Sequence, residues 1–214
     1  MHRATAGTAL AAELALKNKK NFVNLGGGYH HAKRDSGGGF CYFADIPYAV
    51  NCLWKTNPNL KVMIIDLDAH QGNGHEDIFK YDKRISIFDI YCGDNYPRDF
   101  MAKQYINYDF PVKYGIMDSE YLLLLEQNLD FAIKKSKPDL IIYNAGTDIF
   151  AGDPLGRMNI SKDGIIKRDE MVFKFACENL VPVCMVTSGG YSSASAEIIS
   201  DSLKNLINKR YLDF

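Results

Sequence analysis

The sequence lacks an excess of charge of either sign, a long apolar run and a paired cysteine motif. Its 25 Lys and Arg residues and 26 Asp and Glu residues give a formal net charge of −1 over 214 residues, so charge indicates no nucleic-acid partner. A membrane-spanning helix is excluded because no apolar run approaches the roughly 18 residues that it needs. With 47% hydrophobic and 24% charged residues, the composition is typical of a globular protein and excludes disorder, collagen and coiled coils.

The cysteines are odd in number and form no C-x-x-C pair; they occupy positions 41, 52, 92, 177 and 184. Neither a disulfide framework nor a thiolate zinc site is therefore expected, and reduced thiols in the nucleus or cytoplasm are the default. The N-terminal segment has a helical pattern that carries Glu13 and Lys17, which is unlike a secretory signal. We expect a single domain over 1–214 that is not secreted.

Apolar patterns predict strands that alternate with helices. Strands are predicted at 21–25, 61–67, 85–90, 105–112, 140–144 and 181–187, and helices at 4–17, 45–55, 119–135, 163–179 and 192–209. Asp45 is the predicted N-cap of the second helix, with Pro47 in its first turn. Because strands separated by long helices cannot form hairpins, we expect an α/β fold with a mostly parallel sheet and helices on both faces.

Polar residues gather where four of these strands end. They are His30 and His31 after the first strand, Asp66, Asp68 and His70 at the end of the second, Asp148 after the fifth, and Gly189, Gly190 and Tyr191 after the last. Parallel sheets bind ligands at the carboxyl ends of their strands. The sequence therefore predicts a functional site at this edge.

Asp68, His70 and Asp148 are two carboxylates and an imidazole, a set that suits zinc or another first-row divalent ion with one position open to water. Residues two apart in an extended segment point the same way, so Asp68 and His70 can face one ion, with Asp66 on the same side. Asp66 then needs a second cation or a histidine N–H as partner. The alternative is that Asp66 and Asp68 are helix caps or turn residues.

The tandem histidines follow three glycines, which permit a close approach of the backbone to a ligand. Beside a metal-bound water, His30 and His31 can divide the proton transfers, oriented by Asp66 and Asn73. Tyr191 follows two residues able to take positive φ, and its hydroxyl can donate to a developing oxyanion. The alternative for Tyr191 is an incidental aromatic in a strand-to-helix turn.

Five segments closely resemble the zinc-dependent histone deacetylase family: GGGYHHA (26–32), GGGFCYFADIPYAV (37–50), IIDLDAHQGNGHEDIF (64–79), YNAGTDIFAGDPLGRMNIS (143–161) and VTSGGY (186–191). The DLDAHQGNGHE, AGTD and LGRMNIS stretches are similar to the class IV branch, which includes histone deacetylase 11. The resemblance implies a three-layer arginase/deacetylase-type fold. Family members usually have a longer segment before the tandem histidines, so it also implies that the usual N-terminal segment is lacking, leaving a sheet edge or an apolar patch exposed.

The resemblance also implies a role for each matching residue. Zinc is held by Asp68, His70 and Asp148; His30 and His31 are the acid/base pair, hydrogen-bonded to Asp66 and Asn73; and Tyr191 polarises the scissile carbonyl. Gly39, Phe40, Tyr96, Leu155, Gly189 and Gly190 match the acyl-lysine tunnel, and Asp66, Asp68, His70, Asp89 and Ile90 match a structural potassium site.

The resemblance implies hydrolysis of N-epsilon-acyl-lysine in histone tails or other proteins. The class IV resemblance implies a preference for long fatty acyl groups. Two alternatives stay open: deacetylation of small amines such as polyamines, and a non-catalytic zinc-binding module that recruits partners. An arginase-like site with two manganese ions is less favoured, because it has no need for tandem histidines or a Gly-Gly-Tyr segment.

Overall fold

Strand β2 (Val62–Asp66) lies inside the sheet and is buried along its whole length. The computed structural model describes residues 1–213. Six parallel strands pair in the order β1-β6-β5-β2-β3-β4. The other five are β1 (Phe22–Asn24), β3 (Ile85–Cys92), β4 (Tyr108–Val112), β5 (Leu140–Asn144) and β6 (Val183–Val186). The predicted parallel sheet is confirmed, with β4 starting three residues later than expected.

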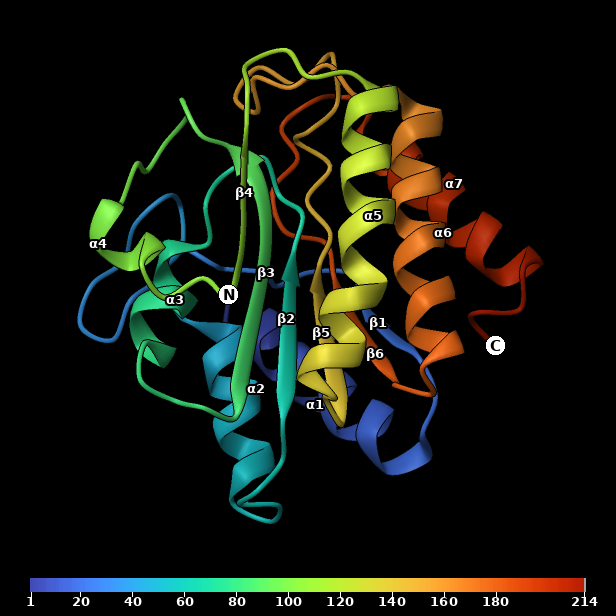
Figure 1. The fold of residues 1–214 in the computed structure, drawn as a ribbon. Helices are drawn as coiled ribbons and strands as arrows, with labels where there is room; N and C mark the ends of the chain where they lie inside the picture. Colours follow the sequence, from blue (N-terminus) through green and yellow to red (C-terminus); the bar gives the residue numbers. More distant parts are fainter. Residues whose placement is uncertain (214) are drawn as a thin grey trace.

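Helices cover both faces of this sheet (Figure 1). They are α1 (His2–Asn18), α2 (Asp45–Trp54), α3 (Asn73–Phe79), α4 (Phe100–Lys103), α5 (Asp118–Ser136), α6 (Lys162–Glu178) and α7 (Ser195–Asn208). Successive side chains of β2 point to opposite faces of the sheet, and each face packs against its own hydrophobic core. Met63 and Ile65 pack with α5, α6 and α7, whereas Val62 and Ile64 pack with α1 and α2.

Two short helices were not predicted. Helix α3 has no apolar helical pattern, because much of its buried face is polar. Asn73, His75 and Glu76 are all buried there. Helix α4 has only four residues, too few for a helical period, and is capped by the Asp99 carboxylate, which accepts from the Ala102 N–H at 3.0 Å.

The prediction that Asp45 caps α2 is wrong. The N-cap is Ala44, and Asp45 lies inside the first turn, fully buried. Its carboxylate accepts from the Thr8 hydroxyl at 2.6 Å and from the backbone N–H groups of Gly28 and Tyr29 at 2.9 and 2.8 Å. Asp45 therefore ties α1 and α2 to the glycine loop directly before the tandem histidines.

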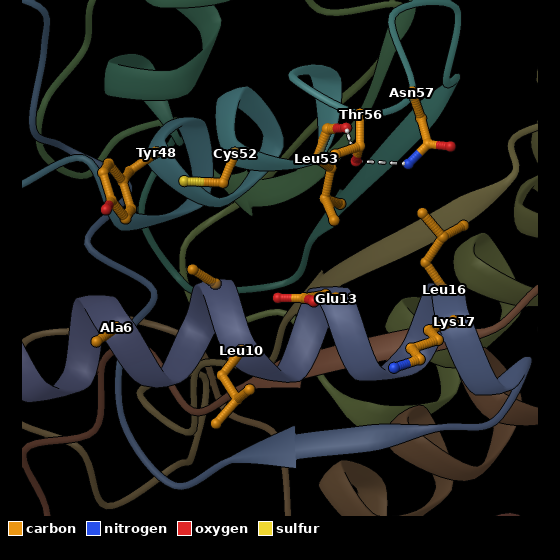
Figure 2. Close-up of a pocket in the computed structure, with 11 residues that line it drawn as sticks. Ala6, Leu10, Glu13, Leu16, Lys17, Tyr48, Cys52, Leu53, Thr56 and Asn57 are labelled. Carbon is orange, nitrogen blue, oxygen red and sulfur yellow. Dashed lines mark hydrogen bonds between the residues drawn. The ribbon is translucent and has the colours of Figure 1, made fainter.

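A groove of about 670 Å³ is lined by residues of α1 and α2 (Figure 2). Leu53 of α2 lies on one side and Leu16 of α1 on the other, and Leu10 of α1 is 56% exposed. The short strand β1 forms one edge of the sheet, and Leu25 directly after it is 72% exposed. Among the described residues, no helix is long and apolar enough to cross a membrane.

Candidate metal and catalytic site

The strand ends bring together residues from four distant segments, as predicted. His30, after β1, lies with its Nδ1 2.8 Å from Oδ2 of Asp66 at the end of β2. The Asn144 amide at the end of β5 donates to Oδ1 of the same carboxylate at 2.9 Å. Ser188, after β6, donates its hydroxyl to Asp68 at 2.9 Å. The carboxyl ends of β1, β2, β5 and β6 therefore form one polar site.

Asp68, His70 and Asp148 are buried, and each offers a ligand atom within 4.8 Å of the others. His70 Nδ1 lies 3.0 Å from Asp68 Oδ1 and 2.9 Å from Asp148 Oδ2. Burial lowers the pKa of His70, but hydrogen bonds and charge from Asp148 and Asp68 outweigh burial and raise this pKa to about 10. The two carboxylates thus stabilise a positive charge at this position. Two carboxylates and an imidazole in this arrangement fit a zinc ion.

Asp68 and His70 lie close together, but not because they alternate along a strand, as the sequence predicted. Strand β2 ends at Asp66, and the two ligand candidates lie in the bend beyond it. The Asp66 carboxylate accepts from the Asp68 N–H at 3.2 Å, and the Asp68 carboxylate accepts from the His70 N–H at 3.0 Å. Each aspartate therefore also shapes an Asx-type turn. The turn interpretation and the metal interpretation of these residues are both compatible with the structure.

The tandem histidines make the two contacts that the family resemblance implied. His30 Nδ1 contacts Asp66, and His31 Nδ1 lies 2.8 Å from Asn73 Oδ1. Burial lowers the pKa of His30, but Asp66 and Asp68 raise it to about 9 overall. Burial and the charge of His30 hold the pKa of His31 well below its usual value. At neutral pH the pair therefore combines one charged imidazole with one neutral imidazole.

The orientation of Asn73 determines which nitrogen of His31 carries its proton. The Asp99 carboxylate accepts from Lys33 Nζ at 2.6 Å and from Asn73 Nδ2 at 3.2 Å. Burial raises the pKa of Asp99, but Lys33 and the Ala102 N–H lower it to about 2, so Asp99 is ionised and can only accept. Asn73 Oδ1 consequently faces His31 and accepts its Nδ1–H. His31 Nε2 is then free to accept a proton, a consequence of Lys33 and Asp99 that the sequence did not predict.

The segment before Tyr191 differs from its predicted geometry. The positive φ, 51°, belongs to Ser188 and not to Gly189 or Gly190. Gly189 is required by close approach instead, because a Cβ there would lie 2.5 Å from Asp148 Oδ2 and 2.6 Å from Asp68 Oδ2. Burial and the carboxylates of Asp68 and Asp148 raise the pKa of Tyr191, so its hydroxyl stays a hydrogen-bond donor.

A cavity of about 370 Å³ opens onto these groups. Within the described chain its lining consists of His31, Gly39, Phe40, His70, Asn95, Tyr96, Pro154, Leu155, Arg157 and Tyr191. Four predicted tunnel residues therefore lie in its wall, whereas Gly189 and Gly190 do not. His31 lines the cavity and His30 does not. Asn95, Pro154 and Arg157 were not predicted, because loop residues without a motif give no signal in a single sequence.

The predicted potassium residues lie beside the metal group. Asp66 and Asp89 are register partners at the ends of β2 and β3, and Ile90 follows Asp89 in β3. Asp89 Oδ2 accepts from the Gly72 N–H at 3.0 Å, whereas its Oδ1 is buried and has no hydrogen-bond partner among residues 1–213. Burial raises the pKa of the neighbouring Glu76 to about 7. A buried carboxylate oxygen without a partner is the feature that a monovalent cation would satisfy.

Arg168 of α6 binds the backbone that carries the candidate metal ligands, and no sequence pattern predicted this role. It is fully buried, and its Nη1 donates to the carbonyls of Leu67 at 3.1 Å and Gly146 at 2.6 Å. Its guanidinium also pairs with Asp169 at 2.8 Å. Arg168 thus fixes the backbone after β2 and β5, from which the three metal-ligand candidates project.

The chain matches known proteins along nearly its whole length. It is 48% identical over 200 residues to histone deacetylase 2 of Arabidopsis thaliana, which covers 94% of this chain and 51% of that protein. Among solved structures, the HD domain of HDA15 superposes with a TM-score of 0.79 at 24% identity, covering 97% of this chain and 61% of that one. Acetylpolyamine aminohydrolase from Burkholderia pseudomallei superposes with a TM-score of 0.79 at 23% identity, covering 94% and 60%.

The solved structures establish the fold of this chain, whereas the family model establishes its family. The two solved structures confirm the arginase/deacetylase-type α/β fold. The chain spans about half the length of the plant relative. The histone deacetylase domain model matches residues 1–207. The chain therefore belongs to the histone deacetylase domain family.

Proposed function

We propose that residues 1–214 are a catalytic domain that hydrolyses the amide bond of N-epsilon-acyl-lysine in histone tails or other proteins. One observation carries this proposal: His31, Tyr191 and His70, which belongs to the buried Asp68–His70–Asp148 group, line a single cavity. A metal-ligand group, a neutral base and a hydroxyl donor are the parts that hydrolysis of an unactivated amide requires. We also propose that the chain belongs to the class IV branch and acts in the nucleus or cytoplasm.

Zinc is the proposed cofactor, held by Asp68, His70 and Asp148. When bound, zinc polarises the amide carbonyl and lowers the pKa of a water molecule toward neutrality. Potassium is the proposed structural ion, held by Asp66, Asp68, His70, Asp89 and the Ile90 carbonyl. Its positive charge would offset the buried carboxylates of Asp66 and Asp89. One oxygen of Asp89 has no hydrogen-bond partner in the part of the chain that the structure describes.

His31 is the proposed base because it lines the cavity and its Nε2 is free to accept a proton. It takes a proton from the attacking water while its Nδ1–H donates to Asn73. The imidazolium formed in this way then gives its proton to the departing lysine amine. His30, outside the cavity lining and paired with Asp66, stays charged and favours the developing negative charge electrostatically.

Tyr191 is the proposed oxyanion donor. Its raised pKa keeps the hydroxyl protonated through the working pH range. As water adds to the carbonyl carbon, negative charge grows on the carbonyl oxygen, and the Tyr191 hydroxyl donates a hydrogen bond to it. Collapse of the tetrahedral intermediate breaks the C–N bond and releases a carboxylate and free lysine.

The cavity wall supports an acyl-lysine substrate. Phe40, Pro154 and Leu155 offer apolar surface to the lysine stem and the acyl chain. Arg157 also lines the cavity and disfavours a polycationic amine, which is the substrate of the alternative function. We propose that long fatty acyl groups are removed faster than acetyl, as in the class IV branch.

The substrate class is tested by comparing three substrates with the zinc-loaded chain: an acetyl-lysine peptide, the matched myristoyl-lysine peptide and an acetylated polyamine. We expect faster amine release from both peptides than from the polyamine, with the myristoyl peptide fastest. Faster release from the polyamine would move the assignment to small amines. Bound zinc with no turnover on any substrate would instead favour a non-catalytic binding module.

A further inference from the structure

One carboxylate joins two of the loops that line the cavity. Asp153 lies after β5, close to the cavity wall residue Leu155, and its side chain accepts four backbone hydrogen bonds. Oδ2 accepts from the N–H groups of Tyr191 at 2.7 Å and Ser192 at 3.1 Å. Oδ1 accepts from those of Leu155 at 2.9 Å and Gly156 at 3.1 Å. Each oxygen therefore serves a different loop.

These bonds matter because neither loop contains a helix or a strand of its own. The segment after β6 runs irregularly to α7, and the segment around Asp153 consists of turns. Gly189 is bound on the metal side, where its N–H donates to Asp68 at 2.9 Å. Asp153 binds the same segment two residues later, at the Tyr191 N–H. The backbone on which the phenol stands is thus fixed by one carboxylate on each side.

We propose that Asp153 is a positioning residue that couples the Tyr191 hydroxyl to the Leu155 wall of the cavity. Its two oxygens accept hydrogen bonds from both loops, and hydrogen bonds to a carboxylate are stronger than those between neutral groups. The Tyr191 hydroxyl is then already in position when the substrate carbonyl binds, so the loop does not have to reorganise first. This inference rests on the proposed function in one respect: the oxyanion is the target of the Tyr191 hydroxyl.

The variant Asp153→Asn removes the side-chain link between the two loops and changes the volume of the side chain little. An asparagine keeps one acceptor oxygen but turns an NH₂ group toward the second pair of backbone donors, so it can bind only one loop. Asp94→Asn is the matched control: Asp94 is exposed, lies near the same cavity, and accepts hydrogen bonds from Arg98 and Arg157 through its backbone carbonyl.

The first test is amide hydrogen exchange, which needs neither zinc nor turnover. We expect faster exchange of the Tyr191 and Ser192 amides, or of the Leu155 and Gly156 amides, in Asp153→Asn, while Asp94→Asn matches the wild type. Unchanged exchange in helix α5 shows that the variant is folded. If Asp153→Asn does not fold, Asp153→Glu, which keeps the charge and displaces the carboxylate, takes its place. Wild-type exchange in both loops would overturn the inference.

The second test is a double-mutant cycle with Tyr191→Phe. If Asp153 acts through Tyr191, Asp153→Asn lowers kcat by roughly tenfold in the wild type, because misplacing a reacting group by about 1 Å can cost up to a hundredfold. The same change then has little effect on kcat in the Tyr191→Phe background. Equal losses of kcat in both backgrounds would contradict a role through Tyr191. Absence of turnover in the wild type would defeat the proposed function, whereas the exchange experiment would still decide the role of Asp153.

Discussion

The groove along α1 and α2 and the cavity at the strand ends differ in volume and in the residues that line them. The groove between α1 and α2 has about 670 Å³ and is lined by Leu10, Leu16, Leu53 and the exposed ends of Glu13 and Lys17, among others (Figure 2). The cavity at the strand ends has only about 370 Å³. Its floor holds His31 and His70, both buried and both hydrogen-bonded to polar partners from other segments.

The volume of a cavity alone therefore does not identify the candidate catalytic site. The larger groove is lined by residues of α1 and α2, and its charged side chains, Glu13 and Lys17, are exposed. At the smaller cavity, burial and the charge of His30 lower the pKa of the lining residue His31, whereas Asp66 and Asp68 outweigh burial and raise the pKa of the neighbouring His30. Paired titratable groups with opposed pKa shifts are a mark of acid/base sites.

The largest effect is expected for Asp148→Ala. Removing one of three buried ligand candidates leaves Asp68 and His70 unable to hold a metal ion firmly. We expect zinc content to fall from one per chain toward zero, and turnover of an acetyl-lysine peptide to fall by more than about a thousandfold. Metal analysis of the purified variant and initial rates measure the two effects. Full zinc content in Asp148→Ala would remove this residue from the ligand set.

Tyr191→Phe is expected to separate catalysis from metal binding. The variant keeps its ring and its contact with Phe40 but loses the hydroxyl. Zinc content should equal that of the wild type, while kcat falls on the order of a hundredfold or more, as for other oxyanion donors. Metal analysis and steady-state kinetics on the same sample measure both. Wild-type turnover would show that the hydroxyl does not meet the oxyanion.

Asp99→Asn is expected to have a smaller effect, through the orientation of Asn73. Without an ionised acceptor, the Asn73 amide can flip and present its NH₂ group to His31, which favours a proton on Nε2 instead of Nδ1. We expect roughly a tenfold loss in kcat with unchanged zinc content. Nitrogen NMR of the His31 ring reports the tautomer directly. A wild-type His31 tautomer combined with a lower kcat would point to a different cause.

Glu13→Gln tests the other side of the comparison and should have the smallest effect. Glu13 lines the larger groove and is exposed, so its loss of charge changes the free energy of unfolding by no more than about 0.5 kcal/mol. Turnover and zinc content should match the wild type. Thermal unfolding and the peptide assay check both. A marked loss of turnover would give the groove a role in catalysis.

The sequence predicted the sheet well, and for a clear reason. The run Val62–Asp66 is apolar because β2 is buried on both faces, and its polar end marks the edge where ligands bind. The contacts of His30 with Asp66 and of His31 with Asn73 followed from the family resemblance and are confirmed. The functional roles of these residues remain proposals.

Other parts of the site could not be predicted, because their residues look ordinary in the sequence. Arg168 stands in a KRDE stretch that suggests a solvated helix face, yet it is fully buried under the metal-ligand candidates. Asp99 and Asp153 act through contacts with segments that are distant along the chain. Such contacts depend on the folded arrangement of loops, and no local pattern specifies them.

The most direct test of the central claim is turnover of an acyl-lysine peptide by the wild-type chain before metal removal, after metal removal, and after zinc is restored. The account holds that Asp68, His70 and Asp148 bind one zinc ion that the hydrolysis requires. It predicts that lysine release stops when a chelator removes the metal and returns in full at one zinc per chain. Undiminished lysine release from the metal-free chain would contradict it.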